Sequence, residues 1–350
     1  MDRLVIRYPA ARSLSLFWNI GRFLGIVLVS QIIRGFFLVF YFVPSINEAF
    51  SRVDYIGREV FFGFIFRILH LNGASLFFFI IFLHVGRGLF FRRFFLENTW
   101  LSGTSILLLV IATAFLGYVL PWGQISFWGA TVITNLISTI PLCGTQLVLW
   151  LWGGFNVGGA TLCFFFSLHY LLPFVVLIIV FLHLIFLHET RRTRSLSTRD
   201  NFYRISFSPF FTSKDFLNVI FFLIFFIFCL NLPWVLGDPE NWVPANALAS
   251  PVHIQPEWYF LFAYAILRCI PRKLGGVIAL VFRVVLLYFL PFFCQKYNIN
   301  FIYLFVLSIF FTSFFILTWL GSCPVEEPFI FLRQFFRLLY FRSFFFLIFL

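Results

Sequence analysis

Charged residues are scarce in this sequence, and their scarcity argues against a soluble protein. Only 11% of the 350 residues are charged, whereas 62% are hydrophobic and the mean hydropathy is +1.00. A typical soluble domain has about 25% charged residues and buries a much smaller share of apolar ones. The composition therefore predicts an all-α polytopic membrane protein whose helices cross the bilayer several times.

Several short motifs are also missing. The six cysteines show neither CxxC nor CxxCH spacing, so we interpret them as small apolar residues with a structural role. The opening residues, MDRLVIRYPAARS, lack the charged, apolar and cleavage-site order of a signal peptide. The Gly-rich stretch GGFNVGGA has no strand-to-helix context, which argues against a dinucleotide site.

Methionine occurs once, whereas phenylalanine supplies 59 residues. This bias is typical of a gene from an A+T-rich organellar genome. The net charge of +12 lies in short runs between apolar segments. That distribution follows the positive-inside rule and argues against binding to nucleic acid.

The apolar runs predict eight membrane-spanning helices, because each run is long enough to cross a bilayer. They lie at 20–43, 62–90, 101–120, 165–187, 215–235, 275–293, 301–320 and 329–349. We expect the first four to form a bundle within residues 1–200 and the last four to form a second part, 201–350. Most basic clusters, and both termini, then fall on one side, which becomes the inner face.

Two long connections are expected to be ordered. The connection 121–164 contains PWGQISFWGATVITNL, which predicts a short helix, and the connection 236–274 carries Asp238, Glu240 and Glu257 among several prolines. Large ordered loops on one face favour a binding or docking surface there.

Four histidines form two pairs with the same spacing. His70 and His84 are fourteen residues apart in one predicted helix, and His169 and His183 are fourteen apart in another. Fourteen residues advance a helix by about 21 Å and almost four full turns, so both members share a face. A histidine within the bilayer is costly and usually has a functional partner.

The two helices run in the same direction, because one helix separates them in the sequence. His70 therefore pairs with His169 near the outer face, and His84 pairs with His183 near the inner face. We predict that each pair holds the iron of one b-type haem. Because both axial positions of the iron are then filled, the pattern favours electron transfer over oxygen chemistry.

Glycines repeat the histidine spacing on the first and third predicted helices. Gly21 and Gly35 are fourteen apart, as are Gly103 and Gly117. Because glycine has no side chain, we expect these positions to let a haem edge approach the helix backbone. Arg67 and Arg87 each precede or follow a histidine by three residues and are candidates for pairing with haem propionates.

The four histidines lie within strings that resemble the cytochrome b family, the haem-bearing core subunit of respiratory complex III, most closely of the mitochondrial type. The matching strings include LHLNGASLFF, LHVGRG, ATAFLGYVLPWGQISFWGATVITNL, LHYLLPF, FLHLIFLHET, GDPENWVPAN and PEWYFLFAYAILR. The resemblance implies that ubiquinol is oxidised at an outer pocket, and that electrons pass through the two haems to an inner pocket where quinone is reduced. It also implies a Rieske iron–sulfur protein, a c-type cytochrome and other complex III subunits as partners, and a homodimer in the lipid bilayer.

The resemblance assigns further residues. At the outer pocket it implies Glu257 as proton acceptor, with Tyr118, Gly129, Tyr259 and Tyr264 around the quinol. At the inner pocket it implies the quinone contacts listed here: Trp18, Asn19, His188 and Asp215.

The sequence departs from the family at two places. Arg191 and Arg192 follow the string HET, 188–190, where small polar residues are usual, and Phe164 stands five residues before His169, where an arginine is usual. The surroundings of the inner quinone and of the outer haem must therefore differ from the usual pattern.

Two alternatives are open on the residues alone. One is another di-haem membrane protein, such as a ferric reductase or superoxide-generating oxidase, which would need a flavin and nucleotide domain that is not apparent here. The other is a haem-free transporter with histidines as proton relays. Such a transporter predicts broken helices and gives no reason for equal histidine spacing.

Overall fold

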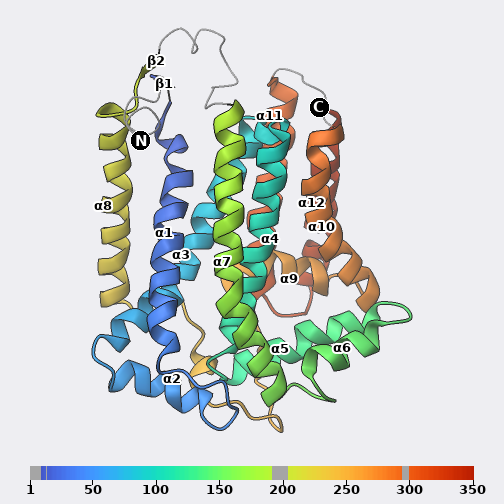
Figure 1. The fold of residues 1–350 in the computed structure, drawn as a ribbon. Helices are drawn as coiled ribbons and strands as arrows, with labels where there is room; N and C mark the ends of the chain where they lie inside the picture. The colour runs from blue at the N-terminus through green and yellow to red at the C-terminus, as the bar shows by residue number, and fades with distance from the viewer. Residues whose placement is uncertain (1–8, 13, 191–203, 294–298) are drawn as a thin grey trace.

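The computed structural model describes residues 9–12, 14–190, 204–293 and 299–350. Long helices run side by side between two ends of the molecule, and several short helices gather at one of these ends (Figure 1). At the opposite end, strands β1 (Pro9–Ala11) and β2 (Arg204–Ser206) pair in an antiparallel two-stranded sheet. The described chain begins and ends at this second end, as the charge distribution predicts for the inner face.

Four long helices form the bundle that the sequence predicts. They are α1 (Ile20–Val39), α3 (Gly63–Phe90), α4 (Glu97–Val119) and α7 (Gly159–Thr190). Helix α1 packs along α3, and α4 packs along α7. Buried apolar side chains from all four helices meet in one core, among them Val27, Phe78, Leu107 and Val176. Because these helices are apolar on nearly every side, they suit burial in lipid as well as in the core.

Short elements cover the end of the bundle opposite the two-stranded sheet, which we call the outer end in keeping with the predicted orientation. They are α2 (Ala49–Arg58), α5 (Gln124–Asn135), α6 (Gly144–Trp152), α9 (Leu261–Arg268) and the 3-10 helices η6 (Pro239–Trp242) and η7 (Trp258–Phe260). Helix α5 confirms the short helix expected in the connection 121–164. The backbone N–H of Gln124 donates to the carbonyl of Val243, and its side-chain amide donates to the carbonyl of Ala249, both at 2.9 Å. These bonds order part of the connection 236–274, as predicted.

The remaining long helices flank the bundle. Helix α8 (Phe210–Asn231) packs against α1 and α3, whereas α10 (Lys273–Phe293), α11 (Phe301–Ser322) and α12 (Phe329–Phe349) lie on the other side (Figure 1). The buried guanidinium of Arg333 donates to the carbonyls of Leu320 at 3.0 Å and Pro324 at 2.9 Å. It thereby caps the last turn of α11 and fixes α12 against it.

All eight predicted long helices form, but only seven described helices are apolar enough by length and composition to count as membrane spans. The eighth, α12, carries three arginines, Arg333, Arg337 and Arg342, which lower its apolar character. The short helices α2, α6 and α9 were not predicted from the apolar runs. Each is too short to span a bilayer, and α2 is amphipathic, with ion pairs Glu48–Arg52 and Asp54–Arg58 on its surface.

Candidate functional site

The structure brings the four histidines together in the two predicted pairs. The ring centroids of His70 and His169 are 6.1 Å apart, and those of His84 and His183 are 6.4 Å apart. In each pair one ring comes from α3 and the other from α7. The two pairs lie at different depths of the bundle because fourteen residues separate them along each helix.

The separation within each pair suits a metal ion held from both sides. A metal–imidazole bond is about 2 Å and each nitrogen lies about 1 Å from its ring centre, so two axial rings have centroids about 6 Å apart. No three His, Cys, Asp or Glu side chains gather around one point among the described residues. Each pair is thus a two-ligand arrangement, as required by an iron whose other four ligands come from a macrocycle.

Hydrogen bonds at Nδ1 orient several of these rings. His169 Nδ1 lies 2.8 Å from the carbonyl oxygen of Thr113, which can only accept, so Nδ1 carries the proton and Nε2 has the free lone pair. Ser102 Oγ lies 3.0 Å from Nδ1 of His183. Such partners fix the tautomer of a ligating histidine and the direction of its ring.

Each of the four predicted glycines faces one of the four histidines. A Cβ added at Gly21 would lie 3.2 Å from Cε1 of His84, and one at Gly35 would lie 3.1 Å from Cε1 of His70. On the other helix pair, the corresponding distances are 3.1 Å from Gly103 to His183 and 2.4 Å from Gly117 to His169. The glycines therefore leave room for the imidazoles themselves, a role that the sequence pattern alone did not reveal.

A cavity of about 300 Å³ joins the outer histidine pair to the short elements at the outer end of the bundle. His70 and His169 line it at one part, and Tyr118, Glu257 and Tyr259 line it at another. Tyr259 also stacks on Phe78 of the bundle core, with ring centroids 4.1 Å apart. The outer histidines and the predicted proton acceptor thus share one largely apolar space.

The environment of Glu257 raises the pKa of its carboxyl to about 7, mainly because burial disfavours the charged form and also because Asp238 is a nearby like charge. The Tyr118 hydroxyl opposes this rise. Neither the Tyr118 hydroxyl nor Oε1 of Glu257 completes a hydrogen bond of good geometry with a described residue, although both atoms are buried. The carboxyl can therefore change its protonation state near neutral pH and has an oxygen available for a ligand.

The two arginines near the histidines have different surroundings. Arg67 Nη1 donates to the carbonyl of Val53 at 3.1 Å, and its guanidinium lies 4.4 Å from the ring centroid of Trp242. Arg67 also lines the outer cavity. Arg87 Nη2 lies 3.4 Å from Nδ1 of His84, beside the ring of Trp18. Arg87 thus lies beside one of the inner histidines, whereas Arg67 shares a cavity with the outer ones.

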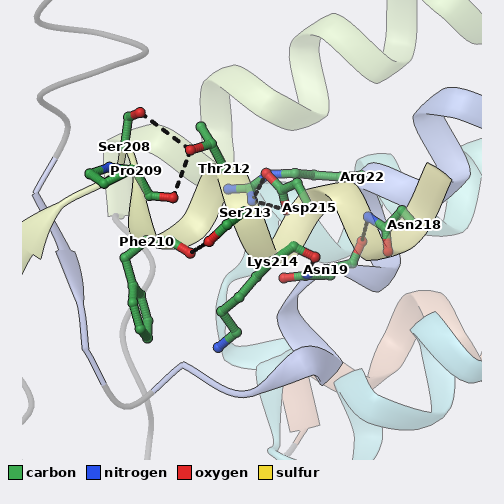
Figure 2. Close-up of polar contacts among 10 residues, drawn as sticks. All are labelled: Asn19, Arg22, Ser208, Pro209, Phe210, Thr212, Ser213, Lys214, Asp215 and Asn218. Carbon is green, nitrogen blue, oxygen red and sulfur yellow. Dashed lines mark hydrogen bonds and ion pairs between the residues drawn. The ribbon is translucent and has the colours of Figure 1, made fainter. Parts of the chain in front are cut away.

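Polar residues of α1 and α8 meet at the inner end of the bundle (Figure 2). Asp215 forms an ion pair with Arg22, and the Asn19 side chain donates to the carbonyl of Lys214 at 2.8 Å. The Asn218 side chain donates to the carbonyl of Asn19 at 3.4 Å. The structure thereby brings two predicted inner-pocket residues, Asn19 and Asp215, to one junction.

Other predicted residues lie outside these two clusters. Trp18 packs against Phe91 with centroids 4.9 Å apart, and His188 is exposed in the last turns of α7. Tyr264 donates its hydroxyl to the carbonyl of Ile254 at 3.0 Å and does not line the outer cavity, and neither does Gly129. Phe164 packs against Trp150, with centroids 5.5 Å apart. Arg191 and Arg192 lie outside the described residues.

Sequence reasoning missed three polar residues of α1 that the structure places at these sites. Arg22 pairs with Asp215, Gln31 donates its side chain to the carbonyl of His70 at 2.9 Å, and Arg34 donates to the carbonyl of Leu69. An available signal was their position inside a predicted membrane span, where polar residues are costly and usually functional.

Comparisons with known proteins agree with this geometry. A family model described as Cytochrome b/b6/petB matches residues 5–191, and one described as Cytochrome b(C-terminal)/b6/petD matches residues 244–341. A chain of the solved structure "Hyperthermophilic respiratory Complex III" is similar over 99% of this chain and 94% of that chain, with 31% sequence identity and a TM-score of 0.91. The family matches cover both the histidine bundle and the region that contains Glu257.

Proposed function

The chain belongs to the cytochrome b family, and on that premise we propose that it is the electron-transferring catalytic subunit of a membrane-bound quinol–cytochrome c oxidoreductase. In this proposal it oxidises quinol at the outer face, reduces quinone at the inner face and so contributes to a transmembrane proton gradient. The observation that carries the proposal is the pair of histidine arrangements, with centroids 6.1 Å and 6.4 Å apart and a glycine against every ring.

His70 and His169 would hold an outer, low-potential haem b, and His84 and His183 would hold an inner, high-potential one. When bound, the two haems supply one-electron carriers between the faces of the membrane. The chain's own contribution is to fix the imidazoles, through Thr113 in the case of His169, and to leave room for them by placing a glycine against each ring. We assign Arg67 and Arg87 to the propionates, because Arg87 lies beside His84 and Arg67 lines the same cavity as His70 and His169.

At the outer pocket, Glu257 would accept a proton from the quinol hydroxyl. A carboxyl with a pKa of about 7 is well matched to this task at neutral pH, because it is partly ionised and yet basic enough to bind the proton. Tyr118 and Tyr259 bound the same cavity and would position the quinol ring. We retain Gly129 and Tyr264 as candidates nearby, since both lie in the elements α5 and α9 that cover the outer end.

At the inner pocket, Asp215 would take up a proton from the inner aqueous side on its carboxylate and pass it to the reduced quinone, with Trp18, Asn19 and His188 as further contacts. Its carboxylate is held by Arg22, which fixes its position between α1 and α8 (Figure 2). The ion pair also gives this pocket a guanidinium that the family pattern did not lead us to expect. A quinone oxygen here would meet both an acid and a cation.

The partners follow from the same proposal. A Rieske iron–sulfur protein would take one electron of each quinol at the outer face and pass it to a c-type cytochrome, and further subunits would complete a homodimeric complex. We propose the mitochondrial inner membrane as the location, with a bacterial plasma membrane as the alternative. The division at residue 200 would separate the haem bundle from the helices that complete the quinol site.

Purification of the protein from its membrane, with its associated subunits, tests the proposal. We expect b-type absorbance, co-purified iron–sulfur and c-type subunits, and quinol-dependent reduction of cytochrome c. A purified chain with no b-type absorbance would contradict the proposal and return the haem-free transporter to consideration.

A further inference from the structure

Arg34 is a buried cation in the middle of a membrane helix. It belongs to α1 and is only 5% exposed. Its Nε donates to the carbonyl of Ser30 at 2.9 Å, and its Nη1 donates to the carbonyl of Leu69 on α3. An arginine remains protonated even when buried, so a full positive charge is held within the bilayer.

No acidic residue neutralises this charge in the described part of the chain. None of the ion pairs found there includes Arg34, and its Nη2 has no hydrogen-bond partner among the described residues. The fully buried thiol of Cys229 on α8, which packs in one cluster with Leu69, also lies near it and carries no negative charge in its thiol form. A buried charge without a counter-ion is costly and is retained where it has a functional role.

The charge lies beside the outer histidine. Leu69, whose carbonyl Arg34 binds, directly precedes His70, and Gly35, which follows Arg34, packs its backbone against the His70 ring. Gly73 on α3 makes room for the guanidinium, since a Cβ there would lie 3.1 Å from Nη2 of Arg34 and 2.5 Å from Oε1 of Gln31. The arrangement fixes a cation near the outer pair, while the inner pair lies almost four helical turns away.

We propose that Arg34 tunes the outer haem by raising its midpoint potential. The inference rests on the proposed function, because it presupposes a haem between His70 and His169. Reduction adds one electron to the ferric iron and no proton, so the charge of the site falls by one. A fixed cation nearby in a medium of low dielectric constant therefore favours the reduced form.

Redox titration of the intact complex, followed by the absorbance of each b-type component, tests this role. In Arg34→Gln, which retains a donor for Leu69, we expect the reduced-to-oxidised ratio of the outer haem at a fixed ambient potential to fall about tenfold, or about 59 mV for one electron. The inner haem should be unchanged. Arg34→Lys keeps the charge and should stay within about threefold of the wild type.

A second pair of variants leaves Arg34 and its contacts in place. Cys229→Asp puts a carboxylate beside the guanidinium. It should lower the reduced-to-oxidised ratio of the outer haem, as Arg34→Gln does, whereas Cys229→Ser should leave that ratio unchanged. An unchanged ratio in Arg34→Gln, or equal shifts in Arg34→Gln and Arg34→Lys, would overturn the proposal in favour of a purely structural contact. If Arg34→Gln assembles no outer haem, an unchanged ratio in Cys229→Asp overturns it. Absence of both haems from the wild-type protein would instead refute the proposed function.

Discussion

Gly117 and His169 fit together so closely that no side chain can stand between them. A Cβ added at Gly117 would lie 2.4 Å from Cε1 and 2.8 Å from Nδ1 of the imidazole, well inside normal contact. The Nδ1 of the same ring lies 2.8 Å from the carbonyl oxygen of Thr113, one turn earlier on α4. A glycine on α4 thus determines where a ligand from α7 can sit.

Gly117→Ala should therefore displace His169 and weaken the outer haem site. Overpacking of a tight interior typically costs about 1–3 kcal/mol, which corresponds to a loss of haem affinity of about tenfold or more. The haem content per chain, measured by absorbance, checks this. Gly25→Ala on α1 is a matched control, because a Cβ at Gly25 meets no atom within 4 Å. Equal haem contents in both variants would contradict the assigned role of Gly117.

His183→Leu should remove the inner haem and leave the outer one. The two pairs use different histidines, so loss of one ligand breaks only one pair. The spectrum of the variant should retain a single b-type component with the lower potential, and His169→Leu should give the complementary result. Loss of neither haem in either variant would show that the cross-helix pairing is wrong.

The rate of quinol oxidation should rise with pH between about 6 and 8. The pKa of Glu257 is raised to about 7, and a base must be ionised to accept a proton. The ionised fraction then grows from about one tenth at pH 6 to about nine tenths at pH 8. Steady-state turnover at saturating quinol measures the profile.

Glu257→Gln should flatten this profile and slow turnover by about a hundredfold or more, the usual contribution of a positioned general base. The affinity for quinol should change less than the rate. Gln255→Glu or Gln255→Ala, two residues away, serves as a control for disturbance of the loop. A Glu257→Gln enzyme with the wild-type pH profile would exclude the carboxyl as proton acceptor.

Asp215→Asn should slow reoxidation of the inner haem by quinone by about tenfold or more, because the proposed proton donor is lost. It also leaves Arg22 without its ionic partner at the junction of α1 and α8. Rapid mixing of reduced complex with quinone gives the rate. Ser213→Ala is a suitable control, because the Ser213 hydroxyl is exposed and donates to a carbonyl of its own helix, that of Phe210, at 2.8 Å. An unaffected rate in Asp215→Asn would remove this residue from the inner pocket.

Much of the bundle could be predicted from the sequence because its signals are periodic. Apolar runs of spanning length fix the long helices, and a fourteen-residue spacing fixes which histidines share a helix face. The order of the helices then determines the pairing. Helix α12 shows the limit of this reasoning. Its Arg333 lowers the hydropathy of the segment, although this side chain is buried against α11 and donates to the carbonyl of Leu320. Hydropathy alone cannot separate a residue that faces lipid from one that faces a neighbouring helix.

The details of the sites depend on contacts between distant segments and could not be predicted in the same way. Arg22 and Asp215 are 193 residues apart, and nothing in either local sequence indicates that they form an ion pair. The raised pKa of Glu257 needs its burial and the nearness of Asp238, which only the folded outer loops create. Likewise, the glycine spacing indicated a close approach without showing that the approaching group is an imidazole.

The most direct test of the account is a redox titration of the purified complex with the number of haems per chain measured in the same sample. Two bis-histidine sites predict two b-type haems per chain, each titrating as a one-electron component, with the two midpoint potentials resolved from one another. A single b-type haem per chain, or none, would contradict the central claim that His70 with His169 and His84 with His183 form two separate haem sites.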